Sequence, residues 1–244
     1  MIPNLFTAGN LVCGVLAIIL SLDDQLRYAP ILIFIAALFD LLDGMIARAL
    51  KVTSELGKQL DSLADMVTFG VAPGIIMYKI MFFVVRLENN DSLEWMVYIP
   101  IIIPVFAMFR LAKFNIDSKH DEHFIGLPTP AMTLFFAAFP LILVQVLENN
   151  LMDQFQVLTL VANLFALTFW IVLMSILMVA PIRMFSLKFK HGKWKDNEIR
   201  YIFLTMSLIL LATVYWWALP IIIIMYVLLS ILSNLLSRKD ATSN

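Results

Sequence analysis

The chain has 244 residues, of which 61% are hydrophobic and 14% charged, and its mean hydropathy is +0.90. Water-soluble domains carry about 25% charged residues, so this composition indicates an integral membrane protein. The net charge of −1 argues against a nucleic-acid-binding protein, and the single cysteine, Cys13, excludes an intramolecular disulfide or a cysteine-based zinc site.

Charged and turn-forming residues divide the chain into eight apolar segments, each close to the ~20 residues that an α-helix needs to cross a bilayer. In chain order we predict helices at 5–22, 29–49, 62–85, 95–112, 129–147, 155–180, 201–218 and 219–237. The last two share one apolar tract, which Trp216, Trp217 and the helix-breaking Pro220 divide into a hairpin. We therefore predict one all-α domain, 1–244, that forms a bundle of about eight transmembrane helices.

Basic residues predict the orientation, because cytoplasmic loops of membrane proteins carry an excess of Lys and Arg. Most of them fall on one side: Arg48, Lys51, Lys58, Arg110, Lys113, Lys119, Arg183, Lys188, Lys190, Lys193, Lys195, Arg200, Arg238 and Lys239. Only Arg27 and Arg86 fall on the other side, and Lys79 lies within the third segment. We expect a multi-pass protein of the cytoplasmic membrane with both termini in the cytoplasm.

Four aspartates lie where this topology places lipid. Asp40 and Asp43 fall inside the second segment, and Asp61 and Asp65 fall at the start of the third. An Asp at the centre of a membrane helix costs about 2.5–3.5 kcal/mol on insertion scales, so such residues are candidates for function. Spacings of three and four residues put each pair on one helix face, and a helical hairpin brings both pairs to its cytoplasmic half.

Four converging carboxylates need a positive partner. Their oxygens suit hard divalent ions, and two such ions would balance four negative charges and clamp a diphosphate. We therefore expect two bound divalent cations, Mg²⁺ or Mn²⁺. The alternative leaves the aspartates as ordinary loop carboxylates that pair with Arg48, Lys51 and Lys58.

Small residues accompany the acids at Gly44, Ala47 and Gly57. A flat group such as a nucleotide base could approach the helix backbone closely at these positions. The alternative is that each small residue serves only helix packing, which is common in membranes.

Residues 40–65 together read D-x2-D-G-x2-A-R-x8-G-x3-D-x3-D. This pattern resembles the signature of the CDP-alcohol phosphotransferases, integral membrane enzymes that transfer a phosphatidyl-type group from a CDP-linked lipid to an alcohol and release CMP. The resemblance implies that Asp40, Asp43, Asp61 and Asp65 hold two divalent metals. It also implies that Asp65 is the base that takes the proton from the attacking hydroxyl.

The same resemblance implies a nucleotide site and a homodimer. Gly44, Ala47 and Gly57 would line the site of the cytidine diphosphate, with Arg48 near it. Two further candidates to hydrogen-bond cytidine or phosphate are Asn4 and Thr7. For these two, the alternative is simple N-capping of the first helix.

Flanking motifs resemble, within this family, the phosphatidylserine synthases of bacteria and archaea. These motifs lie at 2–7, 9–11, 59–65, 69–73, 109–115 and 126–131. Relatives that use glycerol phosphate typically carry a lysine after the last acid, where this chain has Met66. One departure from the serine pattern is Lys113, where we expect an arginine.

The resemblance implies that the phosphatidyl group of CDP-diacylglycerol, or of an ether-linked analogue, passes to L-serine at a site that faces the cytoplasm. Serine carries a carboxylate, so the acceptor site needs a cation, and Arg110 and Lys113 lie three apart on one helix face. Ordinary anchoring of the helix end is the alternative for both residues. Inositol, inositol phosphate and glycerol phosphate are the alternative acceptors.

A cation- or proton-coupled transporter would also use intramembrane acids. Transporters usually show inverted repeats or paired broken helices, and neither is visible in this sequence. Transport also gives no role to the small residues between the acids, so the enzyme is the favoured hypothesis.

Overall fold

The computed structural model describes residues 2–52, 54–88, 91–116, 124–149, 163–186 and 197–242. The long helices are α1 (Ile2–Leu22), α2 (Ala29–Leu50), α3 (Glu55–Asp65), α4 (Ala72–Glu88), α5 (Ile102–Ile116), α6 (Thr129–Asn149), α8 (Leu164–Val179), α9 (Glu198–Val214) and α10 (Ala218–Thr242). Between them lie the π-helical η1 (Met66–Val71) and the 3₁₀-helical η2 (Asp91–Ile101) and η3 (Tyr215–Trp217). The prediction of a helical protein is confirmed. A short antiparallel pair, β1 (Phe124–Ile125) and β2 (Arg183–Met184), has no counterpart in the prediction.

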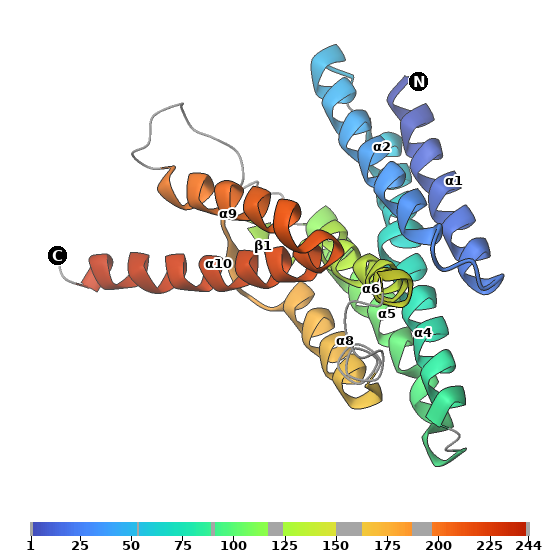
Figure 1. The fold of residues 1–244 in the computed structure, drawn as a ribbon. Helices are drawn as coiled ribbons and strands as arrows, with labels where there is room; N and C mark the ends of the chain where they lie inside the picture. The colour runs from blue at the N-terminus through green and yellow to red at the C-terminus, as the bar shows by residue number, and fades with distance from the viewer. Residues whose placement is uncertain are drawn as a thin grey trace.

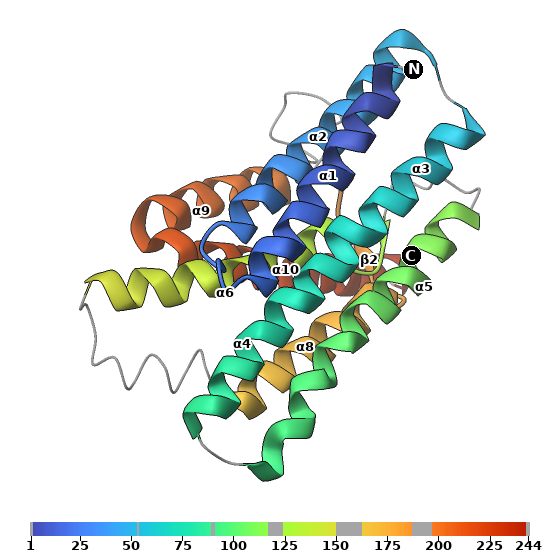
Figure 2. The ribbon, with the colours of Figure 1, turned by 90° about the vertical axis from the view of Figure 1, so that its right-hand side faces the viewer.

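The N-terminal helices form one group. Helices α1 and α2 lie side by side, and α3 continues through η1 into α4 as one long rod that packs along α1 (Figures 1 and 2). After α4 the chain turns back through η2 into α5 (Figure 2). Helices α6 and α10, called here the crossing helices, lie at a steep angle to this group; α6 packs against α2 and α4, and α10 packs against α6 (Figures 1 and 2). The N-terminal group and the crossing helices therefore meet in the middle of the molecule.

Among the described residues, six helices are long and apolar enough to cross a membrane. They are Pro3–Leu22, Ala29–Leu50, Glu55–Leu87, Ser92–Ile116, Thr129–Val146 and Glu198–Leu235, and Leu164–Val179 is a shorter apolar helix. They support the predicted multi-pass membrane protein. The predicted third segment begins earlier than expected, at Glu55, so Asp61 and Asp65 lie inside a helix and not at its start. Most of the predicted stretch 155–163, at the start of the sixth segment, lies outside the described residues.

The C-terminal apolar tract folds back on itself, so that α9 packs against α10 (Figure 1). The reversal lies at η3, where Tyr215 ends α9 with a positive φ of 52°. The predicted hairpin is confirmed, because the break falls within a residue or two of the predicted boundary and Pro220 lies in the first turn of α10. A proline is tolerated there because the backbone N–H that it lacks would have no partner within the helix.

Many large apolar side chains are exposed on the surface, and the interior is filled by aliphatic, methionine, aromatic and alanine side chains. Large exposed side chains such as Leu5, Phe165 and Leu208 match a surface that faces lipid. In the interior, Phe135 of α6 packs against Trp170 of α8, with ring centroids 5.4 Å apart. Buried apolar packing thus joins the crossing helices to the rest of the chain.

Helix α1 comes close to η1 at Gly14. A Cβ atom at Gly14 would overlap the side chain of Thr68 and lie 2.9 Å from its Cα. The absence of a side chain lets Thr68 Oγ1 donate a hydrogen bond of 3.1 Å to the backbone oxygen of Asn10. Because η1 follows Asp65 directly, this contact fixes the end of α3 against α1. Single π-helical turns are frequently found at functional sites.

We predict that Gly14→Ala separates α1 from η1 and lowers the free energy of unfolding by about 1–3 kcal/mol, the usual cost of overpacking. The thermal unfolding midpoint of the purified protein in detergent measures this effect. The matched control is Gly9→Ala, whose added Cβ would meet only the ring of Phe39, at 3.2 Å. That ring needs to shift by only a few tenths of an ångström, so we expect a smaller loss of stability in the Gly9 variant. Equal losses of stability in the two variants would contradict the prediction.

Candidate active site

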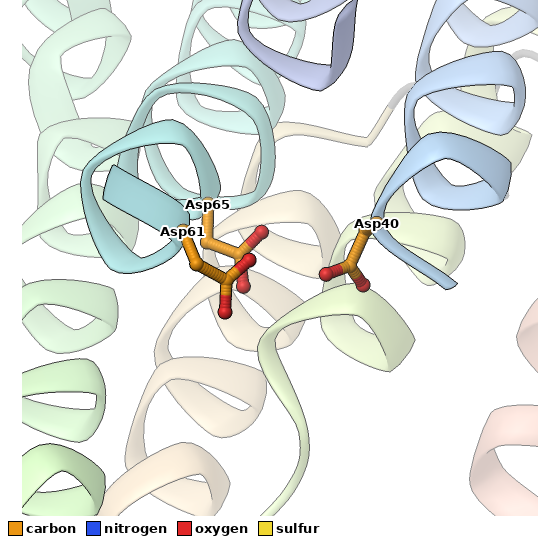
Figure 3. Close-up of side chains that lie close together, drawn as sticks. All are labelled: Asp40, Asp61 and Asp65. Atoms are coloured by element: carbon orange, nitrogen blue, oxygen red, sulfur yellow. The ribbon is translucent and has the colours of Figure 1, made fainter. Parts of the chain in front are cut away.

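Three carboxylates from two helices converge near α1. One oxygen atom from each of Asp40, Asp61 and Asp65 lies within 4.8 Å of the others. Figure 3 shows Asp61 and Asp65 side by side on α3, with Asp40 approaching from α2. The structure therefore brings together three of the four predicted metal ligands, although Asp61 and Asp65 follow Asp40 by 21 and 25 positions in the sequence.

In the described parts of the chain, none of the three carboxylates forms an ion pair within 4.0 Å, and the ion pairs found there join other residues. In addition, Asp61 Oδ1 is buried and has no hydrogen-bond partner. A buried acceptor without a partner is costly, and neighbouring negative charges repel each other strongly where water is scarce. Hard divalent cations are the ions that carboxylate oxygens favour, so this donor set fits such a cation.

Asp43, the fourth predicted ligand, lies beside this group and makes a different contact. Its Oδ2 accepts a hydrogen bond of 2.7 Å from Thr7 Oγ1, and it lies within electrostatic range of Asp61 and Asp65. Thr7 and Asn4 both lie inside α1, which begins at Ile2, so the alternative that they cap this helix is wrong. Thr7 instead connects α1 to α2 at the edge of the acidic group.

Asn10 orients Asp65. The Asn10 side chain is fully buried, and its Nδ2 donates a hydrogen bond of 3.1 Å to Asp65 Oδ1. This bond leaves Asp65 Oδ2 available to a ligand or a proton. Asn10 falls within the motif at 9–11, but no role was predicted for it. Its signal was an amide side chain inside an otherwise apolar membrane segment, which is costly unless the amide has a partner.

The residues predicted to bind the nucleotide lie on α1–α3, beyond the aspartates and toward the turn between α2 and α3. Gly57 faces α1, because a Cβ added to it would lie 3.6 Å from Asn4 Oδ1. Gly44 faces open space, where the nearest atoms to an added Cβ belong to the Arg48 guanidinium, at 3.8 Å. Ala47 is half-buried and Arg48 is exposed. Gly44 therefore leaves room beside the acids, whereas Gly57 lets α3 approach Ser54 and α1 closely.

The two predicted serine-binding cations lie in different surroundings. Arg110 Nη1 donates a hydrogen bond of 3.0 Å to Thr129 Oγ1 at the start of α6, and Arg110 Nε is buried without a partner. The Arg110 side chain also lies within electrostatic range of Asp65 and Tyr226. Lys113, in the last turn of α5, is exposed. Of the two cations, Arg110 is therefore the one that interacts electrostatically with the acidic group, and neither its hydrogen bond to Thr129 nor its proximity to Tyr226 was predicted.

Comparison with known proteins identifies the family. A family model described as CDP-alcohol phosphatidyltransferase matches residues 1–180, about three quarters of the chain. The chain belongs to this family. The resemblance seen in the sequence is thus confirmed, and α9 and α10 lie beyond the matched residues.

Several relatives carry more specific names. A CDP-diacylglycerol–serine O-phosphatidyltransferase of Bacillus subtilis is 37% identical over 129 residues, which cover 53% of this chain and 69% of that protein. The Helicobacter pylori protein of the same name is 33% identical over 211 residues, which cover 86% of this chain and 81% of the relative. An archaetidylserine synthase of Methanothermobacter thermautotrophicus is 34% identical over 140 residues, 57% of each chain.

We predict that the purified protein binds Mn²⁺ and that Asp61→Asn weakens this binding roughly tenfold or more, because one charged ligand is lost without a change of shape. Electron paramagnetic resonance of free Mn²⁺ in a titration gives the affinity. The matched control is Asp23→Asn, an exposed carboxylate after α1, which should leave the affinity unchanged. Equal affinities of the Asp61 variant and the unmodified protein would rule out Asp61 as a ligand.

Proposed function

We propose that this protein transfers the phosphatidyl group of CDP-diacylglycerol, or of an ether-linked analogue, to the hydroxyl of L-serine and releases CMP. Family membership supports the reaction class, and the names of the three relatives all specify serine as acceptor or in the product. One observation in this chain carries the proposal. An oriented carboxylate, Asp65, lies within electrostatic range of Arg110, a cation with a buried and unpartnered N–H group.

The acidic group would activate both reactants. Two divalent cations, Mg²⁺ or Mn²⁺, held by Asp40, Asp43, Asp61 and Asp65, would polarise the diphosphate and stabilise the charge on departing CMP. Asn10 holds Oδ1 of Asp65, so Oδ2 is the oxygen that accepts the serine hydroxyl proton. The serine oxygen then bonds to the lipid-side phosphorus, and the bond between this phosphorus and the CMP oxygen breaks.

Arg110 would select serine by its carboxylate. The hydroxyl and the carboxylate of serine are only a few bonds apart, so a serine at Asp65 needs its cation close to that residue. Thr129 holds one guanidinium nitrogen of Arg110 and leaves Nε to donate a charge-assisted hydrogen bond. Lys113 is exposed, and we assign it a weaker and longer-range attraction for the incoming amino acid.

The nucleotide would lie beside the acids on the α2–α3 side. We assign Gly44, Ala47 and Gly57 to close approach of the cytidine diphosphate, because none of them carries a side chain larger than a methyl group. Arg48 would reach the phosphates. Two side chains of α1, Asn4 and Thr7, would border the same space. Thr7 donates to Asp43, so its hydroxyl would also fix the position of that carboxylate.

The whole chain, 1–244, would act as one domain in the cytoplasmic membrane, with eight crossings and both termini in the cytoplasm. The positions of the basic residues support this orientation, although Lys119, Lys188, Lys190, Lys193 and Lys195 lie outside the described residues. The α9–α10 hairpin begins and ends on the same side, so it does not change the orientation of the termini. The active site would then face the cytoplasm, the source of serine. A homodimer stays a prediction of the family resemblance.

An acceptor panel tests the proposed function. The purified protein is supplied with CDP-diacylglycerol and Mn²⁺, and with serine, inositol, inositol phosphate or glycerol 3-phosphate in separate reactions. We expect CMP release and labelled lipid with serine alone. The isosteric Asp65→Asn variant should lose activity by several orders of magnitude, because it lacks both a ligand and the base. CMP release with another acceptor and none with serine would refute the serine assignment.

We predict that Arg110→Ala raises the KM for serine by roughly tenfold to a hundredfold, the effect of losing a charged hydrogen bond worth about 1.5–3 kcal/mol. Steady-state kinetics with varied serine and then varied CDP-diacylglycerol separate the two substrates. The KM for the lipid should stay unchanged, and Lys113→Ala should have a smaller effect than Arg110→Ala. Loss of lipid binding with an unchanged KM for serine would assign Arg110 to the phosphate instead.

The orientation predicts which loops an impermeant thiol reagent can reach in intact cells. In a Cys13→Ser background, Gln25→Cys in the turn between α1 and α2 should react from outside. Lys51→Cys, in the turn between α2 and α3, should react only after the membrane is opened. Both positions are exposed, so access through the membrane decides the result. Reaction of the Lys51 variant in intact cells would invert the topology.

A further inference from the structure

The C-terminal hairpin holds the backbone of segment 183–186, which contains β2. Tyr226 Oη donates a buried hydrogen bond of 3.0 Å to the backbone oxygen of Phe185. The two rings also pack edge to face, with centroids 4.9 Å apart. One helical turn further along α10, Ser230 Oγ accepts a hydrogen bond of 3.3 Å from the Phe185 N–H. After another turn, Asn234 Nδ2 donates a hydrogen bond of 2.7 Å to Arg183 O. Helix α10 therefore fixes this segment through several side chains.

The held segment in turn fixes the chain that leads into α6. Strand β2 pairs with β1, and directly after β1 the Gly126 N–H donates 2.8 Å to Ile182 O. Leu127 N–H donates 2.9 Å to Leu177 O. Gly126 has a φ of +76°, and a Cβ on it would overlap the backbone oxygen of Met178. This turn therefore has little freedom, and its position follows that of β2.

The same turn ends at the residue that holds Arg110. Thr129, the first residue of α6, is 1% exposed, and its hydroxyl accepts the hydrogen bond from Arg110 Nη1. One turn later, Thr133 Oγ1 donates 2.8 Å to Phe69 O in η1. Tyr226 itself lies within electrostatic range of Arg110. The start of the path at Tyr226 and its end at Arg110 are thus close enough to interact electrostatically.

We propose that Tyr226 is a positioning residue for Arg110 and so contributes to the choice of serine as acceptor. The proposal rests on the proposed role of Arg110 and extends the acceptor site to α10, which lies beyond the residues that the family model matches. The Tyr226 hydroxyl fixes the backbone of Phe185. The β1–β2 pair fixes the turn before α6 relative to that segment, and Thr129 at the end of this turn fixes the Arg110 guanidinium. An arginine held in one rotamer before serine arrives loses less conformational entropy on binding.

Tyr226→Phe tests the proposal, since it removes the hydroxyl and keeps the ring. We expect the KM for serine to rise about three- to tenfold, the effect of one hydrogen bond, with kcat and the KM for the lipid changed less than about twofold. The matched control is Tyr215→Phe in η3 of the same hairpin, a tyrosine that is 66% exposed. It should leave all three constants unchanged. An unchanged KM for serine in the Tyr226 variant would overturn the proposal.

A double mutant separates positioning from general stability. If Tyr226 acts through Arg110, Tyr226→Phe should raise the KM for serine in the native background and have no further effect on it when Arg110 is alanine. A merely structural role would instead lower the thermal midpoint and reduce kcat in both backgrounds. Equal effects of Tyr226→Phe on the KM in both backgrounds would overturn the proposal.

Two variants at the other end of the path keep the test decisive if the tyrosine variant does not fold. Thr129→Ser keeps the hydroxyl and should keep the native KM for serine, whereas Thr129→Val keeps the shape, loses the acceptor and should raise that KM. Equal constants in the two would overturn the proposal. Failure of the proposed function would differ from failure of the Tyr226 proposal, because the unmodified protein would then make no lipid from serine.

Discussion

Mutual repulsion of the carboxylates on α2 and α3 is the constraint on which the rest of this structure depends. Asp40, Asp61 and Asp65 lie within a few ångströms of one another in a protein that exposes many large apolar side chains. Such a group is stable only where neighbouring helices supply hydrogen bonds and where cations can enter. Helix α1 meets the first need through Asn10 and Thr7, which donate to Asp65 and Asp43. Helix α1 therefore stabilises the acidic group through hydrogen bonds, in addition to its expected role as a membrane span.

This support needs close packing between α1 and the rod that contains α3. Gly14 permits the contact, Thr68 secures it, and both act on the turn that directly follows Asp65. Thr133 of α6 donates a hydrogen bond of 2.8 Å to Phe69 O in η1. The same segment therefore joins the acidic helices to the crossing helices.

The candidate site consists of an acidic side and a cationic side that come from different parts of the chain. The acidic side is built by α1–α3, inside the residues that the family model matches. The cationic side is Arg110 of α5, held by Thr129 of α6 and approached by Tyr226 of α10. The first side suits the chemistry at phosphorus that the family shares. The second suits recognition of the acceptor, the feature in which members of such a family differ.

Much of this arrangement could be predicted from local patterns. Long apolar runs predict membrane helices because a bilayer leaves backbone groups no partners except those within a helix. Asp40 and Asp61 could be recognised because charge in such a run is costly and because their spacing places them on defined helix faces. The hairpin before Pro220 could be predicted because a proline fits a helix only in its first turn, although the reversal of the chain itself lies at Tyr215.

The hydrogen-bond partners of the site could not be predicted in this way. Asn10 meets Asp65, and Thr129 meets Arg110, across 55 and 19 residues of chain. Which apolar faces pack together decides these pairs, and in a membrane helix nearly every face is apolar, so the pattern does not distinguish them. The amino-acid sequence therefore determined the class of protein and the acidic motif, whereas helix packing decided which amide and which hydroxyl donate to the acids and which cation lies near them.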